Sequence, residues 1–290
     1  MRPSSPNEGR GWRWLLAGMV GGNLLLALGL AGAQSLGLAS WPPSALLDTR
    51  GWRALVGADA FWHSLLFSAT LAAVTLALAL VAALLLQHAL GAELRRARLT
   101  RLLYLPLAVP GVAAGLLAFI MLGDSGVLSR VGHALGLVTT PADFPALLFD
   151  ADGRGIVLTH LALITPLFLL LFARLAEPLR LPALLEQARA LGASPWSAWR
   201  RVALPLLLRQ SAPVIAVYGL ALIGAYEIPL MLGGARPPMV SVAIAEAVQG
   251  YDLASRPYGY AMACAYLGLL ALAWALVMKL GPARDTDHAP

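Results

Sequence analysis

One carboxylate lies deep inside an apolar block of this sequence: Glu227, in the segment Gly224-Ala-Tyr-Glu-Ile-Pro-Leu. Facing lipid, a charge at that depth would cost several kcal/mol, so we expect it to face a polar path or another chain. Tyr226 adds a ring and a hydroxyl, and Pro229 lacks a backbone donor and can bend the helix. We predict that Tyr226, Glu227 and Pro229 line or gate a route for a cationic or hydrogen-bonding solute. The alternative is that Glu227 only hydrogen-bonds a neighbouring helix.

No residues of the sequence form a recognisable catalytic set. The only lysine, Lys279, lies between Met278 and Leu280, so the glycine-rich turn of a P-loop with its lysine is missing. The five histidines are scattered and none has a metal-binding partner four residues on. No glycine-framed serine suits a nucleophile elbow. We therefore predict that the chain is not an enzyme and has no catalytic residue, metal site or cofactor of its own.

The segment 182–206 is the one long stretch between apolar blocks that is punctuated by polar residues. Residues 184–191 are good helix formers, and Gly192 follows where a helix end favours a left-handed residue. Ser194 before Pro195 is typical of an N-cap and the first turn of a second short helix. The sequence predicts a helix, a glycine turn and a second helix, which is either a docking element or an amphipathic hairpin in the membrane interface.

Six positions of this segment are similar to the EAA loop of permease subunits in binding-protein-dependent ABC importers: Glu186, Ala188, Gly192, Val202, Leu204 and Pro205. The family pattern is E-A-A, three residues, G, nine residues, I-x-L-P, and this sequence reproduces every spacing. It departs from the pattern at Gln187, where the family usually has alanine, and at Val202 in place of isoleucine. Whether Gln187 alters coupling is left open.

Two further stretches carry the resemblance, which covers roughly residues 60–280. Residues 105–111 are similar to the third span of these permeases, and residues 224–234 look like the fifth-span motif of the branch that handles polyamines, iron and thiamine. The resemblance implies a set of residues that couple the permease to an ATPase: Glu186, Ala188, Gly192, Ala193, Ser194, Pro195, Trp199, Leu204 and Pro205.

The resemblance also implies an assembly. Two ATPase subunits, which carry ATP and Mg, would each take one EAA helix in a surface groove, with Trp196 and Trp199 as the buried aromatic face. A second permease chain, more often different than identical, and a solute-binding protein would complete an importer in the bacterial inner membrane. The partners are then these proteins and membrane lipid, with no nucleic acid, and Glu227 favours a polyamine or a similar small cation as substrate.

The elements that must position these residues are membrane helices. The 290 residues are 59% apolar and only 12% charged, whereas a soluble domain is nearer 25%. Spanning a bilayer takes ~20 apolar residues. We predict an all-α integral membrane protein, one permease domain over 1–290, with an EAA coupling helix between spans 4 and 5. The six predicted spans are about 13–34, 62–88, 102–122, 156–176, 211–233 and 258–280.

The basic residues predict the orientation. With both termini in the cytoplasm, most of the 21 basic residues, and the segment 182–206, fall on the cytoplasmic side, as the positive-inside rule requires. The few on the other side are Arg50, Arg53, Arg130, Arg154, Arg236 and Arg256. An alternative for the first span is a signal peptide cleaved near Ala31-Gly-Ala; five further spans favour a retained helix.

Smaller features complete the expectations. Val127 to Leu137 is predicted to form a short external helix, and Thr159 and His160 are predicted to serve helix packing. The pairs Gly18/Gly22 and Gly111/Gly115 have the spacing of close helix contacts. The rival class is a secondary transporter or channel without partners, which usually shows inverted repeats and several intramembrane charges. Neither feature is visible here.

Overall fold

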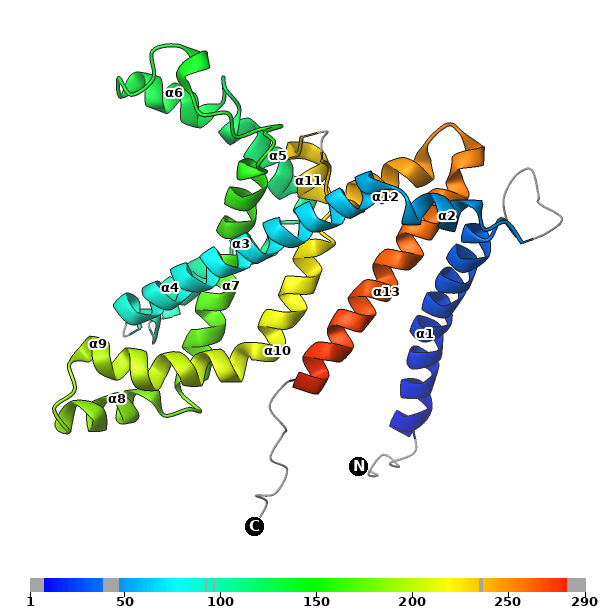
Figure 1. The fold of residues 1–290 in the computed structure, drawn as a ribbon. Coiled ribbons are helices and arrows are strands. Elements are labelled where there is room, and N and C mark those ends of the chain that lie inside the picture. The colour runs from blue at the N-terminus through cyan, green and yellow to red at the C-terminus, as the bar shows by residue number, and fades with distance from the viewer. Residues whose placement is uncertain (1–7, 39–46, 92, 96, 235–236, 281–290) are drawn as a thin grey trace. The chain divides into compact units, whose positions relative to one another are not determined.

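The structure is a computed structural model that describes residues 8–38, 47–91, 93–95, 97–234 and 237–280. Every regular element in these ranges is helical, in agreement with the predicted all-α class (Figure 1). The elements are α1 (Glu8–Ser35), α2 (Arg50–Val56), α3 (Asp59–Leu90), η1 (Glu93–Arg95), α4 (Ala97–Leu103), η2 (Pro106–Ala108), α5 (Gly111–Leu122), α6 (Val127–Ala134), η3 (Pro141–Asp143), α7 (Arg154–Ala176), α8 (Leu181–Ala190), α9 (Pro195–Ala198), η4 (Trp199–Ala203), α10 (Leu204–Ile223), α11 (Glu227–Leu232), α12 (Val240–Gln249), η5 (Leu253–Ser255) and α13 (Arg256–Leu280).

Among the described residues, five helical segments are long and apolar enough to cross a membrane: Asp59–Leu90, Gly111–Ala134, Arg154–Ala176, Pro195–Leu232 and Arg256–Lys279. They correspond to the predicted second to sixth spans. The first predicted span, 13–34, lies within the 28-residue helix α1, which is not one of the five. A count of six spans therefore stays a prediction.

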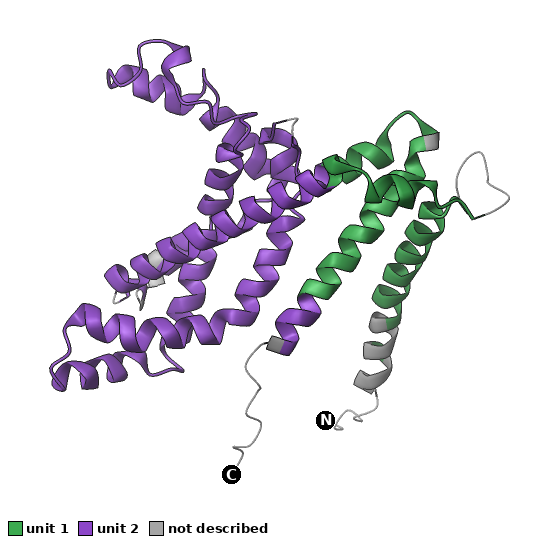
Figure 2. Ribbon diagram, in the orientation of Figure 1, with its two compact units in different colours: residues 1–61, 243–273 green, residues 62–242, 274–290 purple. Residues whose placement is uncertain are grey.

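The chain divides into two compact units, one of residues 1–61 and 243–273 and the other of residues 62–242 and 274–290 (Figure 2). That all 290 residues form one domain stays a prediction. In the first unit, α2 packs closely on the start of α13: a Cβ on Gly51 would lie 2.9 Å from the carbonyl oxygen of Pro257. The indole of Trp52 donates to Ser35 Oγ at the end of α1, at 3.3 Å.

The second unit is built around α7, whose Phe168 and Phe172 are fully buried. Alanines of α3, including Ala79 and Ala83, let that helix approach the phenylalanines, and Leu207 of α10 completes the cluster. A second cluster joins α5, α11 and the start of α7. These two clusters hold the elements that carry both candidate sites.

The third predicted span, 102–122, is not one continuous helix. The chain leaves α4 at Leu103, makes the short turn η2 and resumes as α5 at Gly111. Val109 is extended because it precedes a proline, and Pro110 is extended as the N-cap residue of α5. Pro106 and Pro110, which lie in the stretch 105–111 that resembles the third span of the family, therefore interrupt the span.

The segment between α5 and α7 holds the predicted short helix, which ends at Ala134 rather than Leu137 because Gly136 adopts a φ of 72°. Hydrogen bonds from Thr139 and Thr140 hold the pKa of Asp143 below its ordinary value. Asp150 accepts from the backbone N–H of Arg154 at 3.0 Å, which satisfies a free donor at the start of α7.

Candidate functional site

The segment predicted to couple the permease to a partner forms a tightly closed turn. Helix α8 ends as a Schellman motif: the N–H of Ala193 bonds to the carbonyl of Ala188 at 3.0 Å and the N–H of Gly192 to that of Arg189 at 2.9 Å. This closure requires a left-handed residue, and Gly192 has a φ of 90°. The predicted glycine turn is therefore present. The carbonyls of Ala188 and Arg189 at the end of α8 both have hydrogen-bond partners.

The second arm of the element begins as predicted but continues further. Ser194 Oγ accepts from the N–H of Ser197 at 3.2 Å, and Pro195 occupies the first turn of α9. Pro205 is expected to limit how far this arm runs as regular helix, and the regular α-helix does end at Ala198; the five-residue π-helix η4 then precedes the proline and leads into α10. A wider turn can accommodate a residue that has no N–H to donate. The second arm and the fifth span are thus one continuous helical segment.

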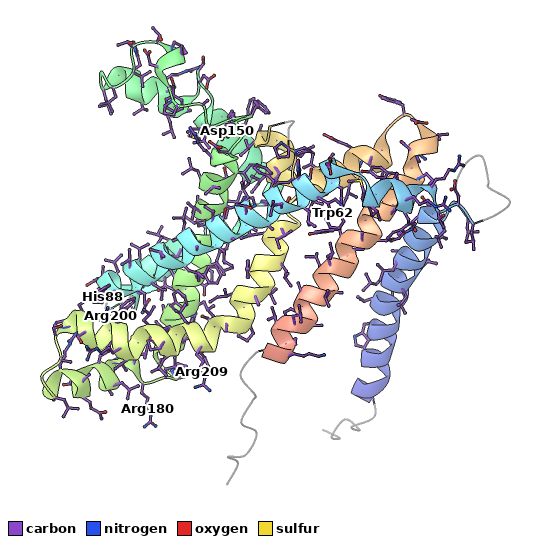
Figure 3. The ribbon with its side chains drawn as sticks, in the orientation of Figure 1. Trp62, His88, Asp150, Arg180, Arg200 and Arg209 are labelled. Atoms are coloured by element: carbon purple, nitrogen blue, oxygen red, sulfur yellow. The ribbon has the colours of Figure 1, made fainter. Side chains whose placement is uncertain are left out.

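Aromatic rings fasten the element to α3. The rings of Trp196 and Trp199 stack with centroids 5.5 Å apart, and His88 lies 5.3 and 5.1 Å from them (Figure 3). Trp199 is only 6% exposed and belongs to the core of its own chain. Trp199 therefore does not lie on a surface for a partner, contrary to our expectation. Trp196 is 49% exposed and remains available for one. His88 has no sequence pattern that marks it, because it meets the tryptophans only after folding.

The outward surface of the element consists of the residues that the core does not take. Glu186 is exposed, as are Ser194 and Pro195 after the turn, and Ala188 is half-buried. Leu191, at the tip, is 89% exposed.

The fifth span is broken one turn before the position that the sequence suggested. Helix α10 ends at Ile223, residues 224–226 are non-helical, and α11 begins at Glu227. We expected Pro229 to bend the helix. It lies instead in the first turn of α11, where its missing N–H costs nothing, and it is buried rather than open to a pathway.

Serine side chains satisfy the backbone at this break. The hydroxyl of Ser241 donates to the carbonyl of Ala225. Ser68 of α3 accepts from the N–H of Val240 at 2.8 Å, at a position with no exposure. Unsatisfied groups in an apolar surrounding cost several kcal/mol each, so these serines make the break tolerable.

Glu227 faces outward at the break. Its side chain is exposed, and the Cβ that Gly111 lacks would lie 3.2 Å from Glu227 Oε2. The carboxylate therefore approaches the N-terminus of α5, whose free N–H groups favour a negative charge. It also interacts electrostatically with the buried His160 of α7. Tyr226 is half-buried and packs on the second core cluster.

Other predicted residues take local roles. His160 Nδ1 lies 2.9 Å from the carbonyl of Ile156, and Thr159 Oγ1 donates to Gly155 at 2.7 Å, so both bond within α7. Gly111 and Gly115 both face α11, as their spacing suggested, whereas nothing lies within 4 Å of a Cβ at Gly18 or Gly22 among the described residues.

These two sites lie at opposite ends of α10, one at a helical hairpin and one between two interrupted spans. Residues 95–284 match the family described as "Binding-protein-dependent transport system inner membrane component". The chain belongs to this family. It is thus the permease component of an ABC importer that depends on a solute-binding protein.

Solved structures agree at the level of the fold. One is described as a bacterial ABC transporter involved in the import of the acidic polysaccharide alginate; at 18% identity it covers 93% of this chain and 99% of its own, with a TM-score of 0.61. Another, the bacterial alginate transporter in complex with alginate pentasaccharide-bound periplasmic protein, has 18% identity, a TM-score of 0.59 and 94% coverage of each chain. A comparison with curated protein sequences gives no match.

The close approach of α5 and α11 in this permease gives the first prediction. A Cβ on Gly115 would lie 2.9 Å from Met231 Sδ and 3.6 Å from the Cα of Ile228. Gly115→Leu should therefore destabilise the protein by about 1–3 kcal/mol through overpacking, measured as a lower thermal midpoint of the purified chain in detergent. Gly22→Leu is the control and should not lower it. Equal midpoints for the two variants would contradict the packing.

Proposed function

We propose that the chain forms half of the solute pathway of the importer and is driven through the segment 182–206. In this proposal the segment seats in the surface groove of an ATPase subunit, which carries ATP and Mg, and the assembly holds two such subunits. A second permease chain, more often a different one, completes the pore. Helix α1 supplies a sixth span, and both termini lie in the cytoplasm.

The observation that carries this proposal is the unbroken helical segment between the two sites. From Pro195 the chain runs through α9, η4 and α10 to Ile223 before it first loses helical structure. Helix α10 alone has 20 residues, or about 30 Å at 1.5 Å per residue. In this proposal a displacement of the hairpin is carried to residues 224–226 along this segment, which includes the π-helix η4 and Pro213 within α10.

The other requirement is a firm attachment of the hairpin. Leu181, Trp199 and Ala203 are buried in the same cluster as Phe172 of α7. The ring contacts of His88 add a link to α3. A force applied at Leu191 or Glu186 is thus transmitted to three spans, while the exposed tip stays free for a partner.

The solute route is proposed to pass the break at Glu227. Discontinuous helices are the parts of transporters that bind solute, since their free backbone groups and charges lie within the membrane. The exposed carboxylate supports a cationic or hydrogen-bonding solute, and a polyamine was the substrate expected from the motif. The comparisons give no support for a polyamine, because two of the matched importers are described with the acidic polysaccharide alginate.

The assembly is tested by pull-down of the tagged, detergent-solubilised chain from its native membrane, followed by mass spectrometry. We expect a P-loop ATPase, a second permease and a binding protein, and the binding protein would narrow the substrate. Recovery of the chain alone, still active in solute flux without ATP, would overturn the proposal in favour of a secondary transporter.

The coupling role of the hairpin predicts a difference between two substitutions at Gly192. No atom lies within 4 Å of a Cβ there, so only the backbone conformation opposes a side chain. Asn adopts the left-handed region readily and a β-branched residue does not; the cost of that region is about 1–2 kcal/mol for ordinary residues. Gly192→Val should abolish ATP-dependent uptake and Gly192→Asn should retain most of it, with equal membrane insertion of both. Full uptake by the valine variant would refute the coupling role.

The pathway role of Glu227 predicts that charge matters more than shape. Glu227→Gln keeps the size and hydrogen-bonding groups of the side chain but removes its charge. Uptake of a cationic solute should fall at least about tenfold, the equivalent of 1.4 kcal/mol, while basal ATP hydrolysis and assembly persist. Unchanged uptake with an unchanged range of solutes would leave Glu227 as a packing residue only.

A further inference from the structure

A cavity of about 1210 Å³ lies between the hairpin of residues 182–206 and the ends of the spans above it, within the second unit. The ends of α3 and α7, helix α4, helix α8 and the start of the α9–α10 segment all contribute to its walls. The proposed function uses Glu186 for docking and Leu181, Trp199 and Ala203 for attachment, all of which line the cavity, and it gives no role to the arginines in its walls.

The cavity is lined by an excess of positive charge. Four arginines and two glutamates contribute to its walls: Arg101, Arg174, Arg180, Arg189, Glu177 and Glu186. Arg174 Nη2 donates to the hydroxyl of Tyr104 at 3.3 Å. Among the described residues, Arg174, Arg180 and Arg189 form no ion pair with a carboxylate. Guanidinium groups with free donors, gathered around one space, are suited to bind a phosphate.

One wall also holds an acceptor that has no donor. Gln87 of α3 is 9% exposed, and its Oε1 is buried without any hydrogen-bond partner in the described part of the chain. A buried acceptor left unpaired costs about 1–3 kcal/mol. Gln87 lines the same cavity as the arginines, so after a rotation of its amide toward the cavity a ligand that carries both a phosphate and a hydroxyl would satisfy both.

The position of the cavity indicates where such a ligand comes from. The walls are ends of membrane-spanning helices, on the side that the basic residues mark as cytoplasmic. Beside Arg101 and Tyr104, the side chains of Leu102 and Leu105 are 61% and 64% exposed. An apolar surface next to a basic cavity suits acyl chains attached to a phosphate headgroup. Basic pockets between helices at this depth are typical binding sites of anionic headgroups.

We propose that this cavity binds the phosphoglycerol headgroup of an anionic membrane lipid. The arginines bind the phosphodiester, and Gln87 Oε1 accepts a hydrogen bond from a glycerol hydroxyl. The bound headgroup joins α8 to α4 and α7, so it stiffens the attachment of the hairpin. The proposal does not depend on which ATPase or solute the permease serves.

The test is native mass spectrometry of the full, delipidated chain in detergent, titrated with short-chain phosphatidylglycerol. Phosphatidylglycerol should bind at least about tenfold more tightly than phosphatidylcholine, and Arg174→Gln or Arg189→Gln should each weaken it about tenfold. The control is Arg209→Gln, an exposed arginine of α10 that does not line the cavity (Figure 3); it should bind as the wild type does. Equal binding by all three variants would overturn the site.

Two further arms test the chemistry of the headgroup. Phosphatidylmethanol has the same charge as phosphatidylglycerol but no hydroxyls in its headgroup. It should therefore bind the wild type more weakly than phosphatidylglycerol does, whereas the two lipids should bind Gln87→Leu equally well. A preference for phosphatidylglycerol that survives in Gln87→Leu would refute the role of Gln87. Soluble glycerol 3-phosphate should compete only at far higher concentration than the lipid. Competition at equal concentration would overturn the lipid assignment in favour of a soluble anion.

Discussion

The structure depends on a constraint that the bilayer imposes: backbone N–H and C=O groups in an apolar medium must find partners within the protein. A continuous helix such as α3 meets the constraint at no extra cost. The interruptions at residues 104–110 and 224–226 do not, and they persist only because other groups serve them. The hydroxyl of Ser241 donates to the carbonyl of Ala225. The hydroxyl of Ser68 accepts from the N–H of Val240, just after the second interrupted span. The chain retains these interruptions at a cost that a merely structural bundle would avoid.

The two interruptions also stabilise each other. Because Gly111 and Gly115 of α5 have no side chains, α11 approaches α5 closely. Glu227, Ile228 and Met231 lie next to the positions that Cβ atoms on these glycines would take. Two short helices that cannot span a membrane singly are thereby packed into one body, on the buried surface of Ile228 and Leu232. This pair joins α10 through the non-helical residues 224–226. A displacement along the α9–α10 segment would therefore reach the pair at that break.

Sequence reasoning was accurate where one residue type has one conformational use. Gly192, Ser194 and Pro195 each have a local role that needs no tertiary information, and the structure confirms those local roles. It failed where the outcome depends on contacts between distant segments. Pro229 was expected to bend the fifth span, but the break is set by Gly224–Tyr226 and their partners in α12 and α5. Trp199 was expected on the surface, but its burial depends on α3 and α7, and the pattern of one helix carries no information about them.

The position of Glu227 limits how tightly the proposed route can hold a cation. The carboxylate lies against Gly111 at the N-terminus of α5, so part of its charge is already balanced by helix N–H groups. A cationic solute must compete with this interaction for the carboxylate. Passage requires binding that is favourable enough for entry and weak enough for release. A carboxylate that is partly satisfied by its own chain meets both requirements, whereas one held in a closed apolar pocket would trap its solute.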